Sequence, residues 1–365
     1  MLRLCSTSTH FFSSASATTS THNRPFAGAG RRAGTLRVRS SFEPLRATPR
    51  PSPLLADLPV FHPPSADSPV LTRISNTLAS TDDHTTTALE SLPLATLFSV
   101  HLDLDASADD TDLDSALTTT LDAARALTRA FEDPAVVQEL KDAASRGEGH
   151  IALEKVNVAF TPQAGFTVLR EVDELQKVQA WQPAEALTNR KAAAYVVALV
   201  AADALARAGI AIDLVAGPAA RHHLLIRTRL MGEELPNLEA VLDVGYPWFF
   251  AADLPGATPV ALATHQVITR LAEAVAVVAR AEGKLEMAAR ALQVMACADW
   301  SGTHEVVREM GLLLADRAKV EGNGNAEGDV ADARAYLEAY VKNTPVTRVN
   351  LQEVKEAEEA LKLLG

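Results

Sequence analysis

Apolar positions recur every three or four residues over most of residues 83–160, a spacing that predicts helices. It is clear in ALESLPLATLFSV (88–100) and DLDSALTTTLDAARALTRAFED (112–133), and PAVVQELKDAASRG (134–147) opens on a proline suited to a first helical turn. The stretch HIALEKVNVAF (150–160) fits either a short helix or a strand. We therefore expect the first part of the folded chain to be mostly helical.

The most apolar stretch of the chain is RKAAAYVVALVAADALARAGI (190–210). It predicts a buried helix from about residue 190 to about 208, with Gly209 as its C-terminal stop. The uncharged run within it ends at Asp203 and is shorter than the roughly 20 residues that a membrane span requires. Three later runs predict the strands of a small antiparallel sheet: IAIDLVAG (210–217), HHLLIRTRL (222–230) and LEAVLDVGYPW (238–248).

From residue 258 to residue 365 helical spacing returns without interruption by strand patterns. Glycine and proline divide this part into five expected helices: 258–283, 284–300, 302–322, 329–345 and 350–365. The sequence alone thus predicts an α+β fold that is mostly helical. It has a helical first part, a helix-plus-small-antiparallel-sheet core, and an α-helical C-terminal array.

The C-terminal helices contain an internal repeat, because GKLEMAARAL (283–292) matches GDVADARAYL (328–337). The matched positions are Gly283 with Gly328, Leu285 with Val330, Ala288 with Ala333, and Leu292 with Leu337. The offset of 45 residues falls to about 34, the tetratricopeptide period, once about 11 residues of the glycine- and asparagine-rich loop after Val320 are removed. We therefore expect residues 258–365 to form tetratricopeptide-like helical repeats, with the last helix as a polar cap.

The N-terminal segment differs from the remainder in charge and composition. Residues 1–50 are rich in Ser, Thr and Ala and hold eight arginines against the single acid Glu43, a net charge of +7. This composition is typical of an organelle transit peptide, and its Ser and Thr content favours the chloroplast stroma over the mitochondrion. The proline-rich residues 51–82 show no persistent period and are expected to be a disordered linker.

Charge and cysteine content narrow the function classes. Because the whole chain carries −12, the part after residue 50 carries −19, which would repel a phosphate backbone and disfavours nucleic-acid binding. Outside the expected transit peptide, which holds Cys5, the only thiol is Cys297. A single thiol forms no internal disulfide, and Cys297, on an apolar helical stretch, is interpreted as a small core residue.

The order of these elements resembles the SirB-type family, a transglutaminase-like domain followed by tetratricopeptide-like repeats. The resemblance covers roughly residues 85–345 and divides the body into residues 83–257 and 258–365. The stretch 190–210 is similar to the family's long helix, and Arg207, Gly209 and Ile210 keep its ending. REMGLLLADRA (308–318) is similar to the family's Arg-Asp-Arg-Gly-Leu-Leu-Leu-Tyr repeat.

Two further motifs place family residues on this chain. VAGPAARHHLLIR (215–227) resembles the family's Pro-Gly-His-Phe-Leu-Val-Arg strand, so the family histidine falls on His223 and the arginine on Arg227. AVLDVGYPW (240–248) resembles the stretch that holds Asp-Pro-Phe and places that aspartate on Asp243. The resemblance implies that His223 and Asp243 are a remnant catalytic pair, joined by a structural hydrogen bond.

Catalysis by such a centre requires a nucleophile, which in the transglutaminase-like superfamily sits at the start of the long helix. Residues 190–195 of this chain read Arg-Lys-Ala-Ala-Ala-Tyr and contain neither Cys nor Ser. The family's Gly-x-Pro-Ile-Ser pattern is also missing there. We therefore expect no catalytic residues.

The sequence also predicts neither a metal site nor a bound cofactor. On a strand, His222 and His223 would point to opposite faces and could not share one ion. An alternating HLDLD (101–105) would put His101, Asp103 and Asp105 on one strand face as metal ligands, although such a stretch is more often a solvated edge.

The sequence thus predicts a non-catalytic protein-binding or scaffold/regulatory protein of the chloroplast, whose protein partners bind through the helical repeats. Two alternatives stay open. One is a cysteine-type acyl transferase or hydrolase, and the other is a small-ligand-binding regulator that uses a cleft between the long helix and the sheet.

Overall fold

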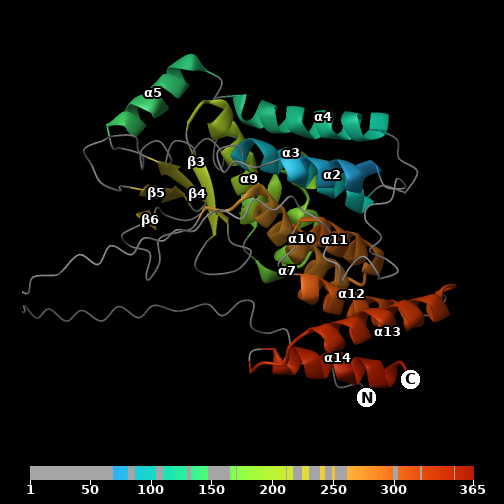
Figure 1. Cartoon of the computed structure of the whole chain (residues 1–365). Helices are drawn as coiled ribbons and strands as arrows, with labels where there is room; N and C mark the ends of the chain where they lie inside the picture. Colours follow the sequence, from blue (N-terminus) through green and yellow to red (C-terminus); the bar gives the residue numbers. More distant parts are fainter. Residues whose placement is uncertain are drawn as a thin grey trace, which may run out of the picture. The chain divides into compact units, whose positions relative to one another are not determined.

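The described part of the chain is mostly helical, with two small β-sheets among the helices (Figure 1). This confirms the expected α+β, mostly helical class. No helix within the described ranges is both long and apolar enough to cross a membrane. A computed structural model describes residues 69–80, 87–103, 110–129, 133–146, 165–169, 171–210, 212–216, 224–229, 239–242, 249–250, 261–298, 303–320, 323–348 and 350–365.

Helix α3 (Thr87–Asp103) is buried on every side rather than along one stripe. Its polar residues are accommodated within the helix, because the hydroxyls of Ser91, Thr96 and Ser99 donate to backbone carbonyls four residues earlier. Apolar spacing predicted this helix, but not the burial of its hydroxyl side. That burial follows from the elements packed around α3: α2 (Pro69–Ser80), α4 (Asp110–Leu127), α8 (Pro183–Asn189), α9 (Ala194–Arg207), α10 (Thr264–Ala281), α11 (Leu285–Ala298) and β3 (Ile212–Ala216).

Helix α2 corrects the expectation that residues 51–82 are a disordered linker. Val70, Ile74 and Leu78 recur every fourth residue and are buried, and α2 packs against α3 and α11. Pro69 occupies the first helical position, where its missing N–H costs nothing. The proline content of the range hid this short apolar stripe. The other residues of 51–82 lie outside the described residues.

The next two helices follow the sequence prediction closely. Helix α4 covers α3 and α8, and α5 (Pro134–Ser145) begins at the expected Pro134. The hydroxyl of Thr128, just after α4, accepts a hydrogen bond from Arg207 near the end of α9. Residues 150–160, expected as a helix or a strand, lie outside the described residues.

The long helix is preceded by a parallel pair of short strands that the sequence did not reveal. Strand β2 (Lys191–Ala193) pairs in parallel with β1 (Thr167–Leu169), and α9 begins only at Ala194. The connection between the two strands contains α7 (Val172–Leu175), the 3-10 helix η3 (Val178–Trp181) and α8. Helix α9 is followed by Gly209, whose φ of 76° fits the predicted C-terminal stop.

The expected antiparallel sheet is present, and a fourth strand extends it. Its order is β3, β4 (Leu224–Arg229), β5 (Glu239–Leu242) and β6 (Phe249–Phe250), with each neighbouring pair antiparallel. Both β3 and β4 pack against α9. Ile212, Leu214, Leu224 and Ile226 join the main core, whereas Val215 and Leu225 form a separate buried pair.

All five helices expected after residue 258 are present. They are α10, α11, α12 (Thr303–Ala318), α13 (Ala326–Asn343) and α14 (Leu351–Leu363). Helix α10 packs along α11, and α12 packs along α13, so the first four form two consecutive hairpins. Helix α14 then lies against α13 and α12 (Figure 1). Gly283 makes the turn of the first hairpin with a φ of 74°, a conformation that favours glycine.

The boundary expected between residues 257 and 258 does not separate two cores among the described residues. Buried apolar side chains from α2 to α14 form one contiguous cluster, and α10 and α11 pack directly on α3. The fully buried hydroxyl of Tyr195, in the first turn of α9, donates to the Val267 carbonyl of α10 at 2.7 Å. The C-terminal helices therefore complete the core of the preceding region.

Gly311 provides a test of the packing between α12 and α13. A Cβ atom at Gly311 would lie 2.7 Å from Cγ of Leu337, too close for the helices to keep their separation. We expect Gly311→Ala to lower the free energy of unfolding by about 1–3 kcal/mol, as overpacking does, measured by urea denaturation. Gly324→Ala is the matched control, because a Cβ there meets nothing within 4 Å. Equal stability of the two variants would contradict this packing.

Candidate functional site

The place where the resembled family keeps its nucleophile is occupied here by a buried strand of alanines. Ala192 and Ala193 lie in β2 and are at most 1% exposed, and the first residue of α9 is Ala194. Exposed Lys191 precedes them. Methyl groups in this position neither attack a carbonyl nor transfer a proton.

His223 and Asp243, which the resemblance implies to be a remnant pair, lie outside the described residues, as does His222, so the pairing of His223 with Asp243 stays a prediction. Arg227, which lies on β4 in the stretch that resembles the family's histidine-containing strand, is among the described residues. Its guanidinium lies 2.8 Å from the carboxylate of Asp213 on the adjacent strand, and both residues are less than 9% exposed. Asp213 and Arg227 are direct partners in the β3–β4 register, so the buried ion pair joins the two strands.

Cys297 has the properties of a core thiol rather than of a nucleophile. It lies near the end of α11 and packs against the main core. Burial raises the pKa of this thiol to about 11. An activated cysteine has the opposite shift, since a nearby positive charge or a helix N-terminus lowers its pKa.

The polar groups at the C-terminal end of α3 connect three helices. Residues 101–103 are helical, so the alternative of a strand with His101, Asp103 and Asp105 on one face is wrong for its described part. The side-chain amide of Gln182 donates to the Asp103 carboxylate at 3.0 Å. Arg290 of α11 donates to the carbonyls of His101 and Leu102, which have no partner within the helix.

Burial dominates the electrostatics of this cluster. It lowers the pKa of His101 to about 4, assisted by the positive charge of Arg290, while a hydrogen bond with Gln293 acts in the opposite direction. Burial also raises the pKa of Asp103, against the hydrogen bond from Gln182. Within the described ranges, no three His, Cys, Asp or Glu side chains lie close enough together to hold a metal ion.

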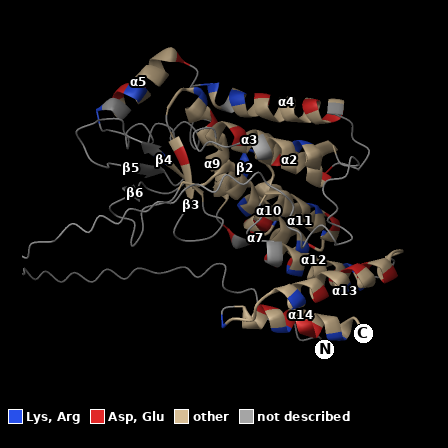
Figure 2. Cartoon of the chain, in the orientation of Figure 1, with Lys and Arg blue, Asp and Glu red and all other residues tan. Residues whose placement is uncertain are grey.

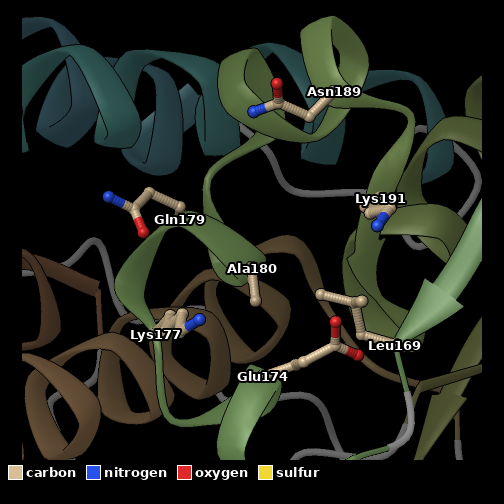
Figure 3. A pocket seen from close by; sticks show the side chains of 7 residues that line it. All are labelled: Leu169, Glu174, Lys177, Gln179, Ala180, Asn189 and Lys191. Atoms are coloured by element: carbon tan, nitrogen blue, oxygen red, sulfur yellow. The ribbon is translucent and has the colours of Figure 1, made fainter.

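A hollow of about 330 Å³ opens beside β2, in front of the connection between the two parallel strands (Figure 3). Its lining residues are Leu169 of β1, Glu174 of α7, Ala180 of η3, Lys191 of β2, and Lys177, Gln179 and Asn189. Leu169 and Ala180 are buried and form its apolar part, whereas both lysines are exposed. In Figure 3 the side chains of Lys177, Glu174 and Lys191 surround the hollow, and the amide of Gln179 points away from it.

The backbone is strained at the edge of this hollow. Arg190, between Asn189 and Lys191, has a φ of 53°. Among the described residues it is the only non-glycine with a positive φ. The left-handed conformation costs an L-residue about 1–2 kcal/mol, and such strain is concentrated at functional sites. The Arg190 carbonyl accepts a hydrogen bond from the Thr167 N–H at 2.8 Å, which ties the strained residue to β1.

Ion pairs hold the C-terminal helices together. Arg280 of α10 pairs with Asp316 of α12 at 2.6 Å, and Arg317 of α12 pairs with fully buried Asp329 of α13 at 2.6 Å. Hydrogen bonds from Arg317, and then from Asn323, lower the pKa of Asp329 despite its burial. Both signs of charge are interspersed along α13 and α14 (Figure 2).

Sequence interpretation missed the hollow entirely. Apolar spacing places Arg190 and Lys191 in the first turn of the long helix, whereas Lys191 lies in β2 and α9 begins only at Ala194. No signal in the sequence showed that the short segments of 169–191 would fold around one space, since none of them has a persistent period.

Comparison with models of known protein families, with curated proteins and with solved structures finds no match for this chain. The resemblance to the SirB-type family therefore rests on the residues quoted above.

The reactivity of Cys297 tests whether it could be a nucleophile. A pKa of about 11 leaves about a hundredfold less thiolate at neutral pH than the ordinary thiol pKa of 9. In a Cys5→Ser background, we expect Cys297 to react with a thiol reagent such as DTNB about a hundredfold more slowly in the native chain than in urea. Native labelling as fast as that of the unfolded chain would contradict the buried thiol.

His101 should make stability depend on pH. In the unfolded chain His101 binds a proton below about pH 6.5, whereas in the folded chain it binds one only below about pH 4. The free energy of unfolding therefore falls as the pH drops from about 6.5 to about 4. The loss at pH 5 should be roughly 2 kcal/mol. We expect the free energy of unfolding in urea to fall more between pH 7 and pH 5 for the natural chain than for His101→Gln. Identical pH profiles would contradict a buried neutral imidazole.

Proposed function

We propose that the chain is a non-catalytic protein-binding or scaffold protein of the chloroplast stroma. In this proposal residues 83–257 are a degenerate transglutaminase-like domain, and α10–α14 form a tetratricopeptide-like array that binds the partner. The observation that carries it is the arrangement of α10 to α13 in two consecutive hairpins, closed by a final helix. Short arrays of helical hairpins commonly present a surface to another protein.

The internal repeat supports the array. Ala288 of α11 and Ala333 of α13 occupy matched positions of the repeat, and both are at most 1% exposed. Leu292 and Leu337, a second pair of matched positions in the repeat, are buried as well. The two helices therefore have equivalent packing faces, each on the second helix of its hairpin.

The beginning of α9 supports the absence of catalysis by a cysteine mechanism. Buried alanines occupy the expected position of the nucleophile, and the thiol of Cys297 has a raised pKa in the core. The chloroplast assignment rests on residues 1–50, which lie outside the described residues, and on their arginine-rich, acid-poor composition.

Helix α14 offers the exposed surface at the end of the array. Its fully buried residues are Val354 and Ala357, while Glu356, Glu358 and Glu359 are exposed. Arg308 of α12 pairs with Glu353 of α14 at 3.1 Å, which fixes the helix on the preceding hairpin. An acidic, anchored helix suits a partner segment that carries basic residues.

Proximity labelling in the organelle tests this proposal with the full chain as bait. We expect a reproducible partner whose labelling falls about tenfold in the variant Glu356→Lys/Glu359→Lys, because charge reversal repels a basic segment. Both glutamates are exposed, so the variant should keep its fold, as checked by circular dichroism.

The matched control reverses two exposed acids outside the array, Asp112→Lys/Asp122→Lys on α4, and should keep the labelling. Repeated labelling without a reproducible partner, or an equal loss in both double variants, would count against binding through the helical array. A separate Cys297→Ala variant should label the same partner as the natural chain.

A further inference from the structure

The hollow beside β2 has the construction of a small-ligand site. Its volume of about 330 Å³ lies at the lower end of the range for ligand pockets, which suits a molecule of metabolite size. Buried Leu169 and Ala180 supply an apolar part, and polar side chains surround it. A few polar groups around an apolar surface are the usual means of orienting a small ligand.

The two lysines of the hollow are not neutralised within the described part of the chain. Neither Lys177 nor Lys191 makes an ion pair with another described residue, whereas most described arginines near the core do. Residues 51–365 carry a net charge of −19, so a hollow with two lysines and one glutamate has the opposite sign to that net charge. A local positive potential on an acidic protein attracts small anions.

Glu174 sets a second requirement on the ligand. Its carboxylate lies among the same side chains as the two lysines (Figure 3). A bare anion would be repelled by it, whereas a ligand with hydroxyl groups could donate hydrogen bonds to it. Asn189 already donates its side-chain amide to Glu185 at 3.0 Å, so its carbonyl oxygen is the atom left to accept.

The strained residue Arg190 is an independent observation at the same place. Its left-handed backbone connects the last residue of α8 to Lys191 and sets the direction in which β2 leaves the helix. A regular continuation of α8 would displace Lys191 from β2 and from the hollow. The fold thus maintains a costly conformation where it positions one of the two cations.

We propose that this hollow binds a small phosphorylated and hydroxylated metabolite of the sugar-phosphate class. Two ammonium groups match the double negative charge of a phosphate monoester, and they come from Lys177, just before η3, and from Lys191, the first residue of β2. The carbon skeleton lies on Leu169 and Ala180, and its hydroxyl groups donate to Glu174. The hollow is separate from α14, so binding of a small ligand there can be tested independently of the protein-binding proposal.

Isothermal titration calorimetry of the full chain tests the site with four probes: ribose 5-phosphate, ribose, inorganic phosphate and malate. We expect ribose 5-phosphate to bind at least about tenfold more tightly than each of the other three. Lys177→Gln and Lys191→Gln should each weaken it about tenfold, while Lys362→Gln on α14, also exposed, should leave it unchanged. All three lysines are exposed, so unchanged thermal midpoints would show that the variants stay folded.

Glu174→Gln separates the two halves of the proposal. It should strengthen the binding of inorganic phosphate by removing a negative charge, and so reduce the preference for ribose 5-phosphate. Absence of binding at millimolar ribose 5-phosphate, or binding that both lysine variants retain, would overturn the site. Equal affinity for malate and ribose 5-phosphate would overturn the assignment to a phosphate ester.

Discussion

The fold depends on the need to cover α3 on all sides. A helix without a polar face is stable in water only when other elements surround it. In this chain the cover comes from both ends of the sequence, with α2, α4, α8 and α9 on some sides and α10 and α11 on others. Described residues on both sides of the boundary at 257 and 258 therefore contribute to one core.

Polar interactions then fix how the C-terminal helices sit on that core. Tyr195 donates to a carbonyl of α10, and Arg290 of α11 satisfies two terminal carbonyls of α3. Further along, Arg280 joins α10 to α12, Arg317 joins α12 to α13, and Arg308 joins α12 to α14. Each exposed ion pair contributes little to the free energy of folding. Arg317, however, pairs with the fully buried carboxylate of Asp329, and this pair restricts how α12 and α13 can pack on each other.

The packing around the start of α9 also determines which side chains line the hollow beside β2. The alanines at the start of α9 serve packing, since they let β2 lie in the core and pair with β1. The hollow in front of that pair is lined by two lysines and a glutamate, together with apolar and amide side chains. The described chain thus combines a hollow beside β2 with consecutive helical hairpins, and each of these features is the basis of one of the two binding proposals.

Elements with a strong local signal could be predicted from the amino-acid sequence alone. The five C-terminal helices, the strands β3 to β5 and the end of α9 at Gly209 follow from apolar spacing and from glycine and proline, which act over a few residues. The other elements depend on packing between segments that are distant in the sequence. Helix α2 forms because α3 and α11 cover its stripe, and β1 pairs with β2 across a connection of more than twenty residues. The hollow beside β2 exists because side chains from five short segments converge, and convergence of distant residues leaves no period in a sequence.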